Sequence, residues 1–118
     1  MKLKLVLFAL FVMVATFAHT VPNSNEDRRD SGEVKIVSIK MQDYYFEPDK
    51  ITIEQGTTVE WINTGKHAHT VTDENESWDS GNLEPGEKFL HRFDEKGIFK
   101  YDCVPHKKID MVGKIIVK

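Results

Sequence analysis

The sequence has one cysteine, no excess of basic residues and no apolar run long enough to cross a membrane, and each shortage excludes a class of protein. A single Cys cannot form an internal disulfide, a zinc site with several thiolates or a four-thiolate iron–sulfur cluster within one chain. With 16 Lys+Arg against 19 Asp+Glu, the net charge of -3 argues against a nucleic-acid partner, which needs a basic face. The 118 residues, 40% of them hydrophobic, suit one domain with one core.

The apolar run lies at the N-terminus, where Leu5–Ala18 follows two lysines. A membrane-spanning helix needs about 20 residues, whereas a positive start, a short apolar segment and small residues after it are typical of a secretory signal peptide. We therefore expect a signal peptide over residues 1–20, cleaved after Ala18 or after Thr20, and export to the periplasm or the extracytoplasmic face of the membrane. An uncleaved anchor is the alternative, and this segment would be the only contact with a membrane.

The rest of the chain divides into a linker and a folded domain. Residues 21–32 hold one apolar residue and five charges, which predicts a flexible linker. Residues 33–118 contain short segments rich in β-branched and aromatic residues, separated by turn residues, and no sustained helical period. We predict an all-β sandwich or barrel. The expected strands are 33–41, 51–53, 57–62, 88–93, 98–103 and 114–117. Alternation within them predicts a core that includes Trp61, Phe89, Phe93, Phe99, Ile115 and Val117.

One short segment carries the chemistry, because Cys103, His106 and Met111 follow each other in the spacing C-x2-H-x4-M. A thiolate, an imidazole and a thioether are soft ligands that favour copper over magnesium or calcium. A copper site of this kind takes a second imidazole from elsewhere in the fold, and the candidates are His67 and His69. A small buried hydrophobe or a Cys–His nucleophile are the alternatives for Cys103, but the sequence contains no nucleophile motif.

Several stretches carry a resemblance to a known family. They are W-I-N-T-G at 61–65, H-T-V at 69–71, D-S-G-N-L-x-P-G-E at 79–87, G-I-F-K-Y-D-C at 97–103, P-H at 105–106 and M-V-G-K-I-I-V at 111–117. In these, residues 33–118 resemble a small cupredoxin of the plastocyanin, pseudoazurin and amicyanin group. The resemblance implies a Greek-key β-sandwich of the cupredoxin type that holds one copper ion.

The resemblance also implies the ligand set. His69, Cys103 and His106 match the near-trigonal ligands of the family, and Met111 matches the long axial ligand. His69 is preferred over His67 because the family's first ligand is followed two residues later by an apolar strand residue. Two positions depart from the family: Thr70 stands where Asn is frequent, and Val104 stands where Ser or Thr is usual. Hydrogen bonding around the thiolate is therefore not implied by the resemblance.

The function implied is that of a type 1 (blue) copper electron-transfer protein. It would shuttle one electron between extracytoplasmic redox partner proteins by cycling Cu(II)/Cu(I), and it would not be an enzyme. We expect a monomer with no nucleic-acid partner and no small-molecule substrate. The alternatives are a copper storage or delivery protein and an accessory electron-donor domain of a larger copper oxidase.

Overall fold

The structure, a computed structural model, describes residues 32–118, so the expected signal peptide and nearly all of the expected linker lie outside the described residues. Eight strands and one 3-10 helix make up the described part. They are β1 (Ile36–Gln42), β2 (Tyr45–Glu47), β3 (Lys50–Ile53), β4 (Thr57–Asn63), β5 (Thr72–Asp73), β6 (Lys88–Phe93), β7 (Gly97–Asp102), η1 (Val104–Ile109) and β8 (Val112–Val117). Among these elements, no helix has the length and apolar character that crossing a membrane requires.

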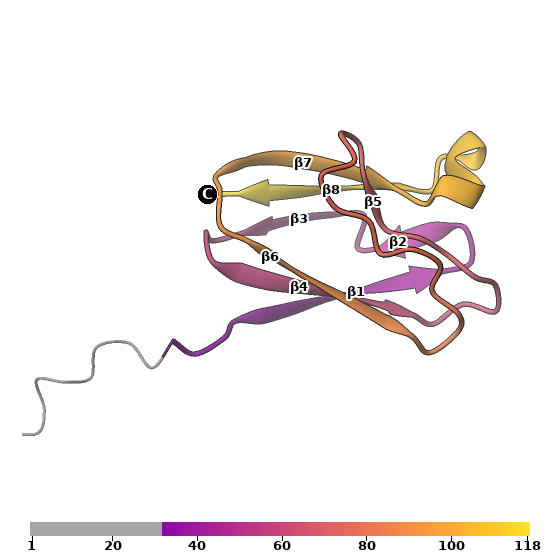
Figure 1. Cartoon of the computed structure of the whole chain (residues 1–118), viewed down its shortest axis with the longest axis horizontal. Coiled ribbons are helices and arrows are strands. Elements are labelled where there is room, and N and C mark those ends of the chain that lie inside the picture. Colours follow the sequence, from indigo (N-terminus) through magenta and orange to yellow (C-terminus); the bar gives the residue numbers. More distant parts are fainter. Residues whose placement is uncertain (1–31) are drawn as a thin grey trace, which may run out of the picture. The chain divides into compact units, whose positions relative to one another are not determined.

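The strands form two four-stranded sheets that pack as two layers (Figure 1). The first sheet has the order β2-β1-β4-β6 and the second the order β3-β8-β7-β5. After β2 the chain passes repeatedly from one sheet to the other before the β7–β8 hairpin. The predicted all-β Greek-key sandwich is thus confirmed.

Strand prediction succeeded where alternation is strong and failed where strands are very short. β6 has the predicted bounds. The first strand was predicted to start at residue 33, but β1 starts three residues later, at Ile36, where pairing with Thr58 of β4 begins. β2 and β5 were not predicted. They contain three and two residues, too few for a periodic pattern, and they form because β1 and β7 offer them antiparallel partners.

The core lies between the two sheets and contains the residues that alternation predicted. Trp61, Phe93, Ile115 and Val117 are buried, and Phe89 and Phe99 are partly buried against them. The Trp61 ring meets the rings of Tyr101 and Phe89 at centroid distances of 5.4 and 5.8 Å. Burial of such large aromatic side chains supplies much of the free energy that holds a small sandwich together.

Parallel pairing determines which loops meet at one end of the sandwich. β1 runs parallel to β4 from the pair Ile36–Thr58 to the pair Met41–Asn63. The turn after β1 and the loop after β4 therefore emerge at the same end. Figure 1 shows η1 at the end of the sandwich away from the C-terminus. Contacts between the turn after β1, the loop after β4 and η1, described below, join the three at that end.

Gly113 of β8 is required by its neighbour across the sheet. It lies directly opposite Tyr101 of β7, and a Cβ at Gly113 would overlap the hydroxyl end of the Tyr101 ring. Tyr101 is 1% exposed, and its ring packs against the rings of Phe46 and Trp61, so a shift of the ring would disturb the core. We expect Gly113→Ala to lower the free energy of unfolding by about 1–3 kcal/mol, as overpacking of a core does.

Urea denaturation of the copper-free protein measures this effect. Val112→Ala, a change at the neighbouring and 47% exposed position of β8, is the matched control and should alter stability by less than about 0.5 kcal/mol. Equal stabilities of the two variants would contradict the assigned packing.

Candidate metal centre

The C-x2-H-x4-M segment folds into a compact loop directly after β7. Cys103 keeps an extended backbone, and the chain then turns into η1, which has a proline in its first turn and a kink at His106. The His106 N–H donates to the Cys103 carbonyl at 3.0 Å, and the Cys103 N–H donates to the Met111 carbonyl at 3.0 Å. The loop therefore closes on itself, and backbone bonds join Cys103 to both His106 and Met111.

The loop between β4 and β5 carries His69 and is held by backbone bonds to Leu83. The His69 N–H donates to the Leu83 carbonyl at 3.0 Å, and the Leu83 N–H donates to the His69 carbonyl at 2.8 Å. Asn63, buried at the end of β4, donates from Nδ2 to the carbonyls of His67 and Leu83 at 2.8 and 2.9 Å. Its Oδ1 accepts from the Gly65 N–H at 2.9 Å. The buried side-chain amide of Asn63 thus connects Gly65 and His67 of this loop to the neighbouring residue Leu83.

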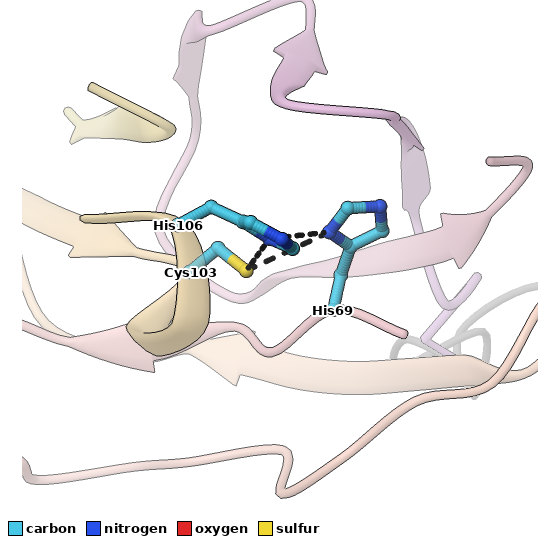
Figure 2. A group of neighbouring side chains, drawn as sticks. All are labelled: His69, Cys103 and His106. Carbon is cyan, nitrogen blue, oxygen red and sulfur yellow. Dashed lines mark hydrogen bonds between the residues drawn. The ribbon is translucent and has the colours of Figure 1, made fainter. Parts of the chain in front are cut away.

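His69, Cys103 and His106 point their donor atoms at one another (Figure 2). The two imidazole Nδ1 atoms are 3.2 Å apart, and the Cys103 Sγ lies 3.6 Å from Nδ1 of His69 and 3.3 Å from Nδ1 of His106. His69 and Cys103 are fully buried, and His106 is half-buried. Such a triangle of one sulfur and two imidazole nitrogens matches the trigonal donor set of copper electron-transfer sites, and its chemistry fits copper.

Met111 lies in the same loop and is fully buried. Its carbonyl accepts from Cys103, and its N–H donates to the His106 carbonyl at 3.4 Å. The backbone therefore links Met111 to two members of the triangle. Its assignment as the axial ligand stays a prediction.

Thr70 bonds to the sulfur and to the residue that follows it. The Thr70 N–H donates to the Cys103 Sγ at 3.4 Å, and the Thr70 hydroxyl accepts from the Val104 N–H at 2.9 Å. Burial raises the pKa of the Cys103 thiol, and the hydrogen bonds from Thr70 oppose that shift. The two positions that depart from the family pattern thus bond to each other and connect the loop after β4 to the loop after β7.

His67 lies outside the triangle, as an exposed side chain of the loop after β4. Its side chain is 58% exposed, and its Nδ1 lies 3.3 Å from the Asp43 carboxylate. The aromatic ring of Tyr44 stacks on His67 and meets the edge of His106 at centroid distances of 5.7 and 5.0 Å. The pKa of His106 is lowered, mainly because burial disfavours the charged imidazole, with further lowering by His69 and His67.

Sequence reasoning did not identify Asp43, whose carboxylate contacts His69. Its Oδ1 lies 3.1 Å from His69 Nε2, the ring nitrogen that faces away from the triangle. The backbone N–H of Lys66 holds the pKa of Asp43 well below its usual range, against a desolvation effect that raises it, and His69 and His67 lower it further. Asp43 stands 26 residues before His69, and only the parallel register of β1 and β4 would have indicated their proximity.

Comparison with known proteins identifies the family. The family described as copper binding proteins, plastocyanin/azurin family, matches residues 32–118. A plastocyanin from Scenedesmus fuscus is 36% identical over 62% of this chain and 86% of its own length. A plastocyanin from Synechococcus sp. (strain JA-2-3B'a(2-13)) is 31% identical over 98% of this chain and 92% of its own length. Two other relatives are longer: the match covers 58% of a chloroplastic plastocyanin from Tetradesmus obliquus and 49% of a halocyanin from Natronomonas pharaonis.

A solved structure also matches the fold. A purple cupredoxin from Nitrosopumilus maritimus superimposes with a TM-score of 0.64 and 28% identity over 70% of this chain and 99% of that chain. The family match and the triangle of donor atoms agree on the metal. The chain belongs to the plastocyanin/azurin family of copper-binding proteins, and copper is its cofactor.

Proposed function

We propose that this protein is a type 1 copper electron carrier, with His69, Cys103 and His106 as the trigonal ligands and Met111 as the axial ligand. The observation that carries the proposal is the convergence of two imidazole nitrogens and one sulfur, all within 3.2–3.6 Å of each other. Copper bound there supplies a one-electron couple between Cu(II) and Cu(I). We propose that none of its residues binds a substrate and that the protein is not itself an enzyme.

The residues of the chain favour fast electron transfer by restricting rearrangement. The carbonyls and N–H groups that bond His69 to Leu83 and Cys103 to Met111 restrict the ligand loops to one geometry. A site whose donors are already in place costs little reorganisation when the charge on the metal changes. Full burial keeps water from three of the four proposed ligands, His69, Cys103 and Met111. These features also disfavour a delivery protein, which must release copper to a partner.

His106 is the proposed exit for the electron. Of the three residues of the triangle it alone is partly exposed. It lies in η1, whose end residues Val104 and Ile109 are exposed, and the exposed Tyr44 ring contacts it at a centroid distance of 5.0 Å. An apolar rim of this kind suits short-lived docking of a redox protein, in which few charged groups must be desolvated. Lys107 is paired with Asp102 at 3.1 Å, so its charge is partly balanced.

The proposed setting is outside the cytoplasm. The N-terminal Leu5–Ala18 run supports export by a signal peptide. We propose a monomer that takes an electron from one extracytoplasmic redox protein and passes it to another, without a nucleic-acid or small-molecule partner.

An absorption spectrum of the copper-loaded protein tests this function. We expect an intense visible thiolate-to-copper band and reversible one-electron voltammetry. Cys103→Ser should abolish the band while the domain stays folded, because serine is close to cysteine in size and the large side chains of the core around Trp61 remain. Ready loss of copper to a chelator together with sluggish voltammetry would support copper delivery instead, and retention of the band in the serine variant would refute the thiolate assignment.

The two candidate histidines can be separated by a matched pair of variants. His69→Ala removes a buried nitrogen from the triangle and should eliminate the visible band. His67→Ala removes an exposed ring outside the triangle and should leave the band nearly unchanged. Copper titration followed by visible absorption and electron paramagnetic resonance measures both. The opposite result would transfer the ligand role to His67.

The axial assignment has its own test. Met111→Gln replaces a soft thioether by a harder oxygen, which stabilises Cu(II) relative to Cu(I). We expect the variant to bind copper and to have a lower reduction potential than the parent in voltammetry. A potential equal to that of the parent would show that the Met111 side chain does not act on the metal.

A further inference from the structure

The carboxylate of Asp43 contacts the rear of one proposed ligand. Its Oδ1 lies 3.1 Å from Nε2 of His69, whereas Nδ1 of the same ring faces Cys103 and His106. The contact is well sheltered, because the His69 side chain is fully buried and that of Asp43 is 24% exposed. Asp43 therefore acts on His69 from the side opposite to the triangle.

The contact determines which ring nitrogen of His69 carries the proton. An ionised carboxylate can only accept hydrogen bonds, and the backbone N–H groups of Lys66 and His67 that donate to Asp43 favour its ionised form. Nε2 must then be the protonated nitrogen, which donates to Asp43. In a neutral imidazole this leaves the lone pair on Nδ1, the atom that points into the triangle.

Several groups hold the carboxylate in this position. The Lys66 N–H donates to both of its oxygens at 3.0 Å, and the His67 N–H donates to Oδ1 at 3.1 Å. Gly65 makes the approach possible, because a Cβ at that position would overlap Oδ1 and would lie 3.0 Å from the Asp43 backbone nitrogen. The loop that carries His69 thus also carries the binding site for the carboxylate.

The turn that carries Asp43 adopts a conformation that is unfavourable for its sequence. The next residue, Tyr44, has φ +77°, in the left-handed region that a bulky residue rarely adopts. Such a conformation is unfavourable for a residue with a side chain and persists where surrounding contacts require it. Two sets of contacts hold the turn in this conformation. Asp43 contacts the loop after β4, and the Tyr44 ring contacts His67 and His106.

We propose that Asp43 is a positioning residue of the copper centre, which fixes the tautomer and orientation of His69 and shifts the site toward Cu(II). The proposal rests on the ligand role of His69 proposed above. A carboxylate bonded to the rear nitrogen makes an imidazole a stronger electron-pair donor, and this favours the metal ion of higher charge. Asp43 thereby lowers the reduction potential.

Two substitutions separate charge from positioning. Asp43→Asn keeps an oxygen that can accept from Nε2 but removes the negative charge, and Asp43→Ala removes the acceptor as well. Removal of such a partner typically weakens metal binding by about 10- to 100-fold. We expect Cu(II) affinity to fall in this range in the alanine variant while Cu(I) affinity changes less. If Cu(II) affinity falls tenfold more than Cu(I) affinity, the reduction potential rises by about 59 mV. The asparagine variant should show a smaller rise.

A measurement without copper tests the positioning role directly. Nitrogen-15 NMR of the copper-free protein at about pH 8, where an ordinary imidazole is neutral, reports the tautomer of His69. The parent should have the proton on Nε2, and Asp43→Ala should populate the Nδ1–H form, since Nδ1 can then donate to His106. Gly65→Ala, which displaces the carboxylate without removing it, should act in the same direction.

Asp110→Asn is the matched control for charge alone. It removes the same charge from an exposed position next to Met111, and its backbone conformation, φ 60°, is one that Asn tolerates. The proposal is overturned if Asp43→Ala retains the Nε2–H tautomer, or if its potential rises no more than that of Asp110→Asn. A parent protein without a visible copper band would instead refute the proposed function, so the two failures are distinguishable.

Discussion

Two imidazole nitrogens and one sulfur must be kept within 3.2–3.6 Å of each other and largely away from water. Polar atoms are costly to bury unless they have partners, and such a cluster is not formed by local sequence alone. The backbone fixes it from two directions, through the paired bonds of His69 with Leu83 and through the bonds that close the loop from Cys103 to Met111. The rest of the sandwich holds these two loops at a constant distance, so the proposed ligands are in position before a metal ion binds.

The topology explains how one end of a small sandwich can carry the whole site. Parallel pairing of β1 with β4 sends two loops out at the same end, and these meet the loop that follows β7. Asn63 and Gly65 then control the approach of the loops. Asn63 does so through three hydrogen bonds of its side chain, and Gly65 does so by having no side chain. Conventional core packing around Trp61 and Tyr101 stabilises the sandwich, while a few polar residues at its end position the chemistry.

The sequence was informative where a pattern is local. Alternation predicted β6 and the inward faces of β4, β7 and β8, and the short spacing from Cys103 to Met111 predicted a soft-metal loop. It was uninformative where the cause is a contact between distant segments. β2 and β5 exist because neighbouring strands pair with them, and Asp43 reaches His69 only through the register of two parallel strands. The role of Thr70 was likewise invisible, since its hydroxyl is bonded to the backbone of a residue 34 positions away.

The individual character of this copper centre therefore lies outside the ligand set. The spacing of Cys103, His106 and Met111 resembles that of plastocyanin and pseudoazurin, so these residue types alone do not distinguish the chain. The residues that surround the proposed ligands depart from the usual pattern at Thr70 and Val104. The Thr70–Val104 bond connects the two ligand loops without the Asn and the Ser or Thr frequent at these positions. Asp43 places a carboxylate behind His69, where a neutral carbonyl could also accept the hydrogen bond from the imidazole. Because hydrogen bonds and charge near the ligands tune a copper potential, Thr70 and Asp43 are the residues through which we expect this chain to set the potential of its proposed donors.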